Sequence, residues 1–482
     1  MAHEPHPHAR SGGGRGEAPL TQRVFRADRG GAVPLADVIA AIATPPGRGG
    51  IGIVRVSGSN LAPIIDGIVA RKLQPRVATL AAFRGARGEV LDEGLALFFP
   101  APASYTGESV LELHGHGGSA VLALVLKRCL ELGARLAEPG EFTKRAFLND
   151  KLDLAQAEAV ADLVDAATAT AARAATRSLS GEFSRDVQRI VEELVELRMF
   201  TEAALDFPEE DIEFIRAADA AGKLAAPRQR LAALLEHSRG ANLLREGLHV
   251  VLLGAPNVGK SSLLNRLVGE EVAIVTPIAG TTRDALRSSI EIHGVPLHVI
   301  DTAGLREATD EVEKIGIARA RTAAGRADLA LIVTDAREDE NLNEVSLVAR
   351  LPTTLPRIVV RNKIDLAGEP SRRTLENGVR RVWLSAKTGR GVDLLQNAIL
   401  DAAGAHEDME GTFLARERHL QALSAADAHL AAAAAHLAAQ PPPLELFAEE
   451  LRVAQDALSS ITGKFTADDL LGEIFSRFCI GK

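Results

Sequence analysis

The spacing of apolar residues changes character along the chain. Up to about residue 150, short apolar runs such as Ile39–Ala43 and Gly52–Val56 alternate with amphipathic stretches, which predicts a mixture of strands and helices. A Pro- and Gly-rich turn at residues 45–50 separates these first two runs. Val110–His114 predicts a further strand, and Ala120–Gly133 predicts a helix that carries Cys129 as a core residue.

Residues 152–244 instead show helical spacing, for example at Ile190, Leu194 and Leu197, with an interruption near residues 207–211. The chain from Phe413 to its end is again helical in pattern, with a break at residues 441–443. Between these stretches lie short apolar runs of strand length, beginning at Leu248. Two helical stretches that flank an α/β module predict that the module is inserted into one helical bundle.

The composition narrows the classes of function. A length of 482 residues allows about three domains. With 64 acidic against 55 basic residues the net charge is −9, so any contact with nucleic acid needs a local basic patch or a partner. Two cysteines and the absence of an apolar run of about 18 residues predict a cytoplasmic protein without a membrane helix. Residues 1–34 are rich in His, Arg, Gly and Pro, and we expect a disordered extension.

The segment Gly254-Ala255-Pro256-Asn257-Val258-Gly259-Lys260-Ser261 lies between a predicted strand and a predicted helix. In that context a Gly-rich loop turns its backbone N–H groups onto phosphate oxygens at the positive end of the helix dipole. Lys260 would neutralise the outer phosphates, and the Ser261 hydroxyl would bind Mg²⁺.

Three later motifs indicate that the nucleotide is a guanine nucleotide. Asp301-Thr302-Ala303-Gly304 follows an apolar strand and would face the metal and the last phosphate. In Asn362-Lys363-Ile364-Asp365 the carboxylate accepts from the ring N–H and the amine of guanine, a pattern that adenine does not offer. Ser385-Ala386-Lys387 would close over the base. Leu305 stands where Ras-like GTPases carry a water-orienting glutamine, so an acid nearby (Glu307, Asp310, Glu311 or Glu313) takes that role or is a solvated loop residue.

Further motifs give the chain a family resemblance. They are Ala43–Gly50 (ATPPGRGG), Gly115–Gly118 (GHGG), Pro139–Phe142 (PGEF), Ala146–Leu154 (AFLNDKLDL), Asp301–Arg306 (DTAGLR) and the ending Phe478–Lys482 (FCIGK). In this order they resemble the MnmE (TrmE) family of tRNA-modification GTPases over nearly the whole chain after the N-terminal extension.

The resemblance implies a multidomain α/β plus α architecture: a folate-binding N-terminal α/β domain, a helical bundle, and an inserted P-loop G domain with a Ras-like, mostly parallel sheet. The boundaries expected here are residues 35–150 for the first, 151–245 and 405–482 for the two parts of the helical domain, and 246–404 for the G domain. It also implies a homodimer and a heterotetramer with an FAD protein of the MnmG type. Together they add an aminomethyl or carboxymethylaminomethyl group to carbon five of the wobble uridine of tRNAs. The one-carbon unit comes from a tetrahydrofolate derivative.

The resemblance assigns roles to individual residues. The folate contacts would be Arg55, Glu112, Lys151 and Lys482, although Arg55 and Lys151 on their own pass for surface charges. A K⁺ ion would be held by Asn257, Thr276, Ile278 and Thr281, and Mg²⁺ by Ser261 and Thr282. Glu313 would orient the attacking water. Cys479 is either a nucleophile or a small buried hydrophobe. The residues expected to contact GTP are Asn257, Val258, Gly259, Lys260, Ser261, Ser262, Thr276, Pro277, Ile278, Ala279, Gly280, Thr281, Thr282, Asp301, Thr302, Ala303, Gly304, Asn362, Lys363, Ile364, Asp365, Ser385, Ala386 and Lys387.

Two other functions remain open on the sequence. A ribosome-assembly GTPase would need a basic RNA-binding domain after the G domain, whereas the chain after Asp401 is Ala-rich and acidic to neutral. A folate-dependent aminomethyl transferase with a regulatory GTPase differs mainly in which domain is the enzyme.

Overall fold

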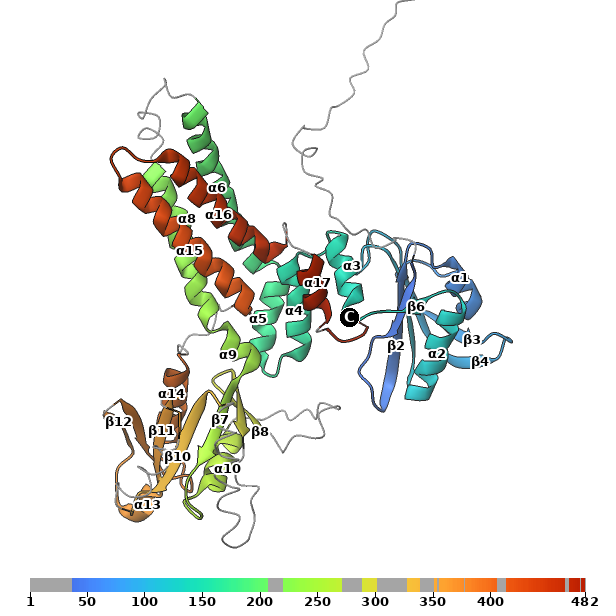
Figure 1. Ribbon diagram of the computed structural model, residues 1–482. Coiled ribbons are helices and arrows are strands. Elements are labelled where there is room, and N and C mark those ends of the chain that lie inside the picture. Colours follow the sequence, from blue (N-terminus) through green and yellow to red (C-terminus); the bar gives the residue numbers. More distant parts are fainter. Residues whose placement is uncertain are drawn as a thin grey trace, which may run out of the picture.

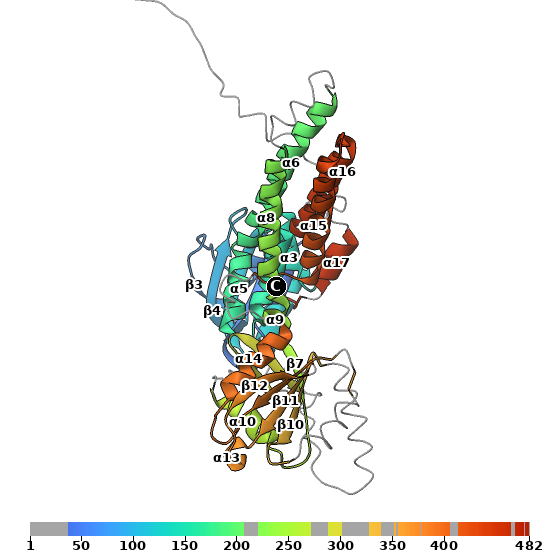
Figure 2. The same cartoon turned by 90° about the vertical axis from the view of Figure 1, so that its left-hand side faces the viewer.

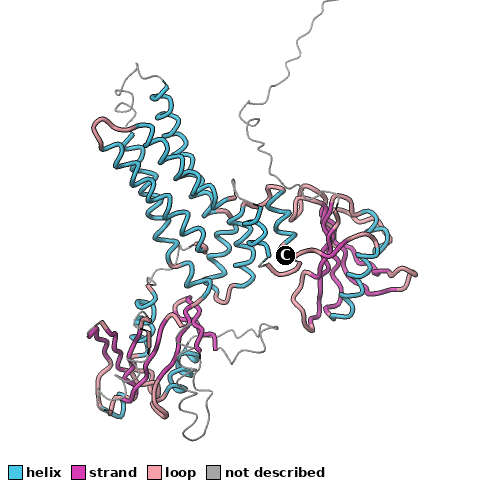
Figure 3. The backbone as a smooth tube through the Cα atoms, viewed as in Figure 1, coloured by secondary structure: helices cyan, strands magenta, loops and turns pink. Residues whose placement is uncertain are grey.

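The computed structural model describes residues 37–206, 220–270, 288–300, 327–338, 351–352, 355–376, 378–404, 413–463, 468–476 and 478–481. These residues form an N-terminal α/β body, a helical body and a second α/β body (Figure 1). Figure 3 shows that strands occur only in the first and last of the three, while the body between them is helical. The predicted multidomain fold class is confirmed, whereas residues 1–34 lie outside the described part.

The N-terminal body contains a six-stranded sheet in the order β3-β4-β5-β2-β1-β6. All neighbouring strands are antiparallel except β1 and β6. β2 begins at Gly49, inside the stretch predicted as a turn. The strands are β1 (Ile39–Ile42), β2 (Gly49–Gly58), β3 (Thr79–Arg84), β4 (Val90–Phe99), β5 (Ser109–Gly117) and β6 (Arg135–Leu136).

Helices cover one face of this sheet, and the core between them holds Cys129, which is 0% exposed as predicted. Alternate strand residues such as Val54, Val56, Leu111 and Leu113 face these helices because successive side chains of a strand point to opposite faces. The covering elements are α1 (Ala62–Ile64), η2 (Ile65–Val69) and α2 (Ser119–Glu131).

Among the described residues, α3 (Glu141–Leu148) covers the other face of the sheet near β1 and β2, where it contributes Phe142. The end of the chain packs against the start of this helix. Gly140 donates from its backbone N–H to the Cys479 carbonyl (3.4 Å), Pro139 bridges Ile480, and Phe478 lies against Gly140. The C-terminus therefore lies beside the N-terminal body (Figure 1).

The helical body is built from two parts of the chain, which confirms that the second α/β body is inserted into it. α6 packs on α16 and α8 on α15 in a common core that contains the predicted stripe at Ile190, Leu194 and Leu197. Figure 2 shows these paired helices side by side. Within the described ranges, no helix is both long and apolar enough to cross a bilayer. The helices are α4 (Leu154–Asp165), α5 (Ala169–Leu179), α6 (Glu182–Asp206), α8 (Ala220–Arg239), α9 (Ala241–Glu246), α15 (Glu417–Ala438), α16 (Leu444–Thr462) and α17 (Asp468–Ser476).

A buried ion network joins the two parts. Glu158 of α4 is 1% exposed and accepts two hydrogen bonds from Arg418, at 2.9 and 2.6 Å. Nε2 of His419 lies 2.9 Å from the same carboxylate without hydrogen-bonding geometry. Arg416 pairs with Asp162 at 2.8 Å. Burial alone would raise the pKa of Glu158, but His419 and Arg418 hold this pKa far below its usual value.

The second α/β body has a seven-stranded sheet in the order β12-β13-β11-β10-β7-β9-β8. Its central strands are parallel and both edge pairs are antiparallel. The elements are β7 (Leu248–Leu253), α10 (Lys260–Glu270), β8 (Ser288–Ile292), β9 (Val295–Ile300), β10 (Leu329–Asp335), β11 (Arg357–Asn362), α13 (Ile364–Ala367), β12 (Arg372–Glu376), β13 (Val379–Trp383) and α14 (Val392–Ala403).

The turn between β8 and β9 contacts the helical body. Thr168 caps α5 by accepting from the Ala171 N–H (3.1 Å) and donates its own hydroxyl to the Gly294 carbonyl (2.9 Å). Gly294 has φ +88°, and a Cβ there would lie only 2.5 Å from Thr170 Oγ1, so a side chain is excluded. One capping residue thus fixes both the start of α5 and the hairpin.

We expect Glu158→Gln to destabilise the helical body by about 3 kcal/mol, because it leaves the partly buried Arg418 guanidinium without its carboxylate. Thermal and urea unfolding followed by circular dichroism at pH 7.5 measure this loss. The control is Glu196→Gln, which removes a solvent-exposed partner of Lys223 (3.4 Å) and should leave the unfolding midpoint nearly unchanged.

The pH dependence gives a second readout of the same variant. Because the folded pKa of Glu158 is depressed, its contribution is present above its ordinary pKa of about 4.5 and is lost as the pH falls toward the folded value. The stability difference between wild type and Glu158→Gln should therefore shrink below pH 4.5. Equal stability of wild type and Glu158→Gln at pH 7.5 would show that the ion network does not hold the two parts of the helical body together.

Candidate nucleotide site

The phosphate loop connects β7 to α10, as predicted. Gly254 has φ +148° and Gly259 has φ +100°. A Cβ at Gly254 would collide with the Val333 carbonyl, and one at Gly259 with the side-chain amide of Asn362. Glycine is therefore needed at both positions, for conformation and for space.

Lys260 and two serines lie where this loop enters the helix. Lys260 Nζ donates to the carbonyls of Gly254 (2.8 Å) and Ala255 (2.9 Å), so the ammonium group lies over the loop itself. Ser261 and Ser262 are exposed in the first turn of α10. The first turn of a helix has unpaired N–H groups, which favours an anion here.

Asn362 connects three of the four predicted motifs: the phosphate loop, Asn362–Asp365 and Ser385–Lys387. Its amide Nδ2 donates to the Val258 carbonyl of the phosphate loop (2.9 Å). Its Oδ1 accepts from the backbone N–H of Lys363 (2.8 Å) and of Ala386 (2.9 Å). All donors and acceptors are buried or nearly so, and one side chain therefore fixes the relative positions of the three loops.

Lys363 adds a second link that the motifs alone did not reveal. Its Nζ donates to the Asn257 carbonyl (2.6 Å) and to Asp335 Oδ2 (3.0 Å). Hydrogen bonds from Arg337, and then from Lys363, hold the pKa of Asp335 well below its usual range. Asp335 is the last residue of β10, and its position at the carboxyl end of a parallel strand was the available sequence signal.

Asp365 has an unsatisfied acceptor. Its Oδ1 is buried without a hydrogen-bond partner among the described residues. Beside it, Ile364 and Ser385 are fully buried. Arg266 donates to the carbonyls of Ala386 (3.1 Å) and Lys387 (2.7 Å), a contact that sequence reasoning missed. A buried carboxylate oxygen without a donor fits a ligand that supplies N–H groups at this point.

The remaining predicted nucleotide and metal contacts lie outside the described residues. They are Thr276, Pro277, Ile278, Ala279, Gly280, Thr281, Thr282, Asp301, Thr302, Ala303, Gly304 and Glu313. Of the predicted metal ligands, the structure describes Asn257, which has φ +63° and is exposed, and Ser261.

A second polar cluster lies on the face of the N-terminal sheet that carries α3. Arg55 donates to Glu112 from Nε (3.0 Å), and His114, two residues along β5, lies 3.1 Å from the other carboxylate oxygen. The Arg55 guanidinium lies 5.5 Å from the Tyr105 ring and 5.8 Å from the Phe142 ring. The structure thus brings Arg55 and Glu112 together. His114 and Tyr105 were missed, although His114 shares a strand face with Glu112.

Of the other predicted residues, the structure describes Lys151 and Cys479 and does not bring them into this cluster. Lys151 lies beside Gly107, where a Cβ would be 3.2 Å from the Lys151 side chain. Lys482 lies outside the described residues. Cys479 is exposed, unlike Cys129, whose thiol pKa is raised to about 12 by burial. Because Cys479 is exposed, it is not the small buried hydrophobic residue that the sequence allowed.

The chain matches two family models in order. One described as "GTP-binding protein TrmE N-terminus" matches residues 38–151, and one described as "MnmE helical domain" matches residues 154–479. The second match includes the chain after the nucleotide body, which removes the ribosome-assembly alternative.

Two similar proteins of nearly the same length agree with these family matches. "tRNA modification GTPase MnmE" of Dechloromonas aromatica is 59% identical, with 92% of this chain and 99% of the relative covered. That of Azoarcus sp. is 61% identical, with 92% and 98% covered. The FeoB G-domain of Methanococcus jannaschii is 25% identical over 33% of this chain and 98% of its own, at a TM-score of only 0.24. Since the first two similarities extend over nearly the full length of both proteins, the chain belongs to the MnmE family of tRNA modification GTPases.

Proposed function

We propose that this chain is a potassium-activated GTPase that works with an FAD protein of the MnmG type on the wobble uridine of tRNAs. Together they would add an aminomethyl or carboxymethylaminomethyl group to carbon five, with a tetrahydrofolate derivative as one-carbon donor. GTP hydrolysis in tRNA modification itself follows from membership of the family. The buried, unpartnered Oδ1 of Asp365 is the observation that best supports guanine nucleotide as the ligand.

The described residues support a division of roles in hydrolysis. Asp365 accepts from guanine, and Asn362 keeps the base loops against the phosphate loop. Lys260 exchanges its bonds to Gly254 and Ala255 for phosphate oxygens. Mg²⁺, held by Ser261 and Thr282, would neutralise phosphate charge. Glu313 would orient the attacking water.

Potassium activation is proposed through Asn257, Thr276, Ile278 and Thr281. A K⁺ ion beside the phosphates would stabilise charge that develops in the transition state, as an arginine finger does. The exposed side chain of Asn257 supports this role. Hydrolysis would be triggered when the G domains of two copies meet.

Folate binding is proposed on the face of the N-terminal sheet that carries α3. Glu112 offers a carboxylate to the amide edge of a pterin, while Arg55 lies between that carboxylate and two aromatic rings. Lys151 and Lys482 would bind the glutamate tail, and Cys479 would act as a nucleophile. Exposed apolar side chains on the N-terminal body, Ile51, Leu80 and Leu95, support a homodimer through this body.

The domain boundaries given above, at residues 35–150, 151–245, 246–404 and 405–482, and a cytoplasmic location are part of the same proposal.

Nucleoside analysis of tRNA tests the overall function. In a strain that lacks this protein, mass spectrometry should show wobble uridines without the carbon-five aminomethyl group. The wild-type gene on a plasmid should restore the group. Normal modification in the deletion strain would remove the proposed role.

The base site is tested by Asp365→Asn. The amide presents a donor where guanine also presents donors, so GTP binding should weaken by about 100-fold or more and preference should shift to xanthosine triphosphate. Calorimetry with both nucleotides measures this shift. A variant that still prefers GTP would show that Asp365 does not read the base.

The cation site is tested by exchanging the monovalent salt. Turnover of GTP should be about tenfold or more faster in K⁺ than in Na⁺ at matched ionic strength, and Asn257→Ala should abolish the difference. Equal rates in both salts for the wild type contradict potassium activation.

A further inference from the structure

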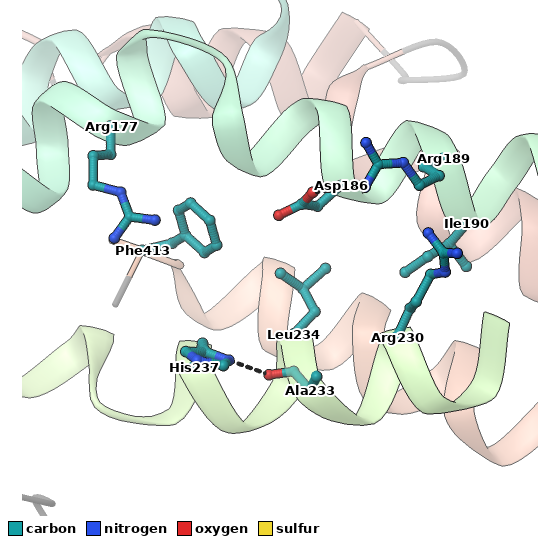
Figure 4. Close-up of a pocket in the computed structure, with 9 residues that line it drawn as sticks. All are labelled: Arg177, Asp186, Arg189, Ile190, Arg230, Ala233, Leu234, His237 and Phe413. Carbon is teal, nitrogen blue, oxygen red and sulfur yellow. Dashed lines mark hydrogen bonds and ion pairs between the residues drawn. The ribbon is translucent and has the colours of Figure 1, made fainter. Parts of the chain in front are cut away.

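A cavity of about 340 Å³ opens in the helical body, away from the nucleotide loops and the N-terminal sheet. It lies between α5, α6 and α8, at the point where the chain returns from the nucleotide body at Phe413 (Figure 4). Its floor is apolar: Ile190, Leu234 and Phe413 are 1%, 5% and 6% exposed. Such a cavity is far larger than a single inorganic anion and has the size of a small-ligand site.

Three arginines and one carboxylate line the rim of the cavity. Arg177, Arg189 and Arg230 come from α5, α6 and α8 respectively, against one carboxylate, Asp186. Figure 4 shows these guanidinium groups around the apolar floor. In a chain of net charge −9, α8 carries four basic residues (Lys223, Arg228, Arg230 and Arg239) and one acid, Glu236.

Each rim arginine has one acid nearby, but these pairs do not saturate the guanidinium groups. Arg177 lies 2.9 Å from Glu182, Arg230 lies 3.4 Å from Glu193, and Arg189 lies 3.8 Å from Asp186. The arginine side chains are 35%, 46% and 59% exposed, and exposed pairs of this kind contribute little to stability. A guanidinium group has five N–H donors, so each retains donors for an anionic ligand.

Two further contacts orient the rim. The Arg177 guanidinium lies 4.8 Å from the Phe413 ring centre, which holds it at the edge of the cavity. His237 is bonded through Nδ1 to the Ala233 carbonyl (2.7 Å), so in the neutral ring Nδ1 is the donor and Nε2 is an acceptor. A ribose 2′-hydroxyl can donate to such a nitrogen.

We propose that this cavity binds the sugar-phosphate backbone of the tRNA substrate. Guanidinium groups from three helices suit successive phosphates, and the apolar floor suits a ribose or base face. The proposal depends on tRNA being the substrate, as proposed above. The same phosphate chemistry is present in inorganic phosphate and free nucleotides. Inorganic phosphate would leave the apolar floor unused, and a mononucleotide would reach only part of a rim formed by three helices.

The test measures binding of a fluorescent tRNA transcript to the full-length protein by anisotropy, from 50 to 300 mM salt. Arg189→Ala/Arg230→Ala should weaken binding about tenfold or more and should lower the slope of log K against log salt by about 1.5. The control is Arg373→Ala/Arg380→Ala, which removes the same charge from the β12–β13 hairpin and should leave affinity and slope unchanged. Both variants should retain wild-type unfolding midpoints and wild-type GTP hydrolysis without tRNA.

Four results would overturn the proposal. They are wild-type affinity and slope for Arg189→Ala/Arg230→Ala, an equal loss in the hairpin control, displacement of tRNA by millimolar pyrophosphate, and failure of the wild-type protein to bind tRNA. Displacement would identify a small-anion site instead. Failure of the proposed function is seen separately, because the nucleoside analysis of the deletion strain does not depend on this cavity.

Discussion

Glu158 is a buried carboxylate on the first helix of the helical body, and the groups that contact it come from the chain after it has passed through the nucleotide body. Arg418 and His419 are about 260 residues away in sequence, and both meet the same carboxylate. A buried charge without partners is strongly unfavourable, so α4 and α15 have to come together for either to be stable. This requirement closes the helical body and brings both connections of the inserted body to one end of it.

α5 then links two sites of different chemistry. Its capping residue Thr168 donates to Gly294 in the β8–β9 turn, and its last turn carries Arg177 at the rim of the cavity. β9 ends at Ile300, directly before the predicted metal- and phosphate-facing segment Asp301–Gly304. One helix of 11 residues and one hairpin therefore connect the nucleotide motifs to the proposed RNA contact.

The sequence predicts the positions of residues whose roles depend on local spacing. Gly254, Gly259, Asn362 and Asp365 could be predicted because a phosphate loop and a base loop each need particular residues at fixed offsets. The pairing of Lys363 with Asp335, the network around Glu158 and the cavity rim could not, because each joins elements far apart in sequence. The sequence prediction also left out strands β3, β4, β6, β8 and β12. In the edge strands β3 and β12, exposed Leu80 and Leu375 interrupt the apolar-in, polar-out alternation.

The chain handles phosphate in two physically different ways, and the difference follows from exposure. In the nucleotide loop, backbone N–H groups, one lysine and the proposed metal ions act together at short range, because fixed dipoles in a partly enclosed loop are little screened. On the open rim, water and salt weaken every single contact, so several cations are needed. Arginine suits that position better than lysine, since its planar donors bind two phosphate oxygens at once and its flat face packs on Phe413. An overall acidic protein can therefore contact RNA locally without binding polyanions generally.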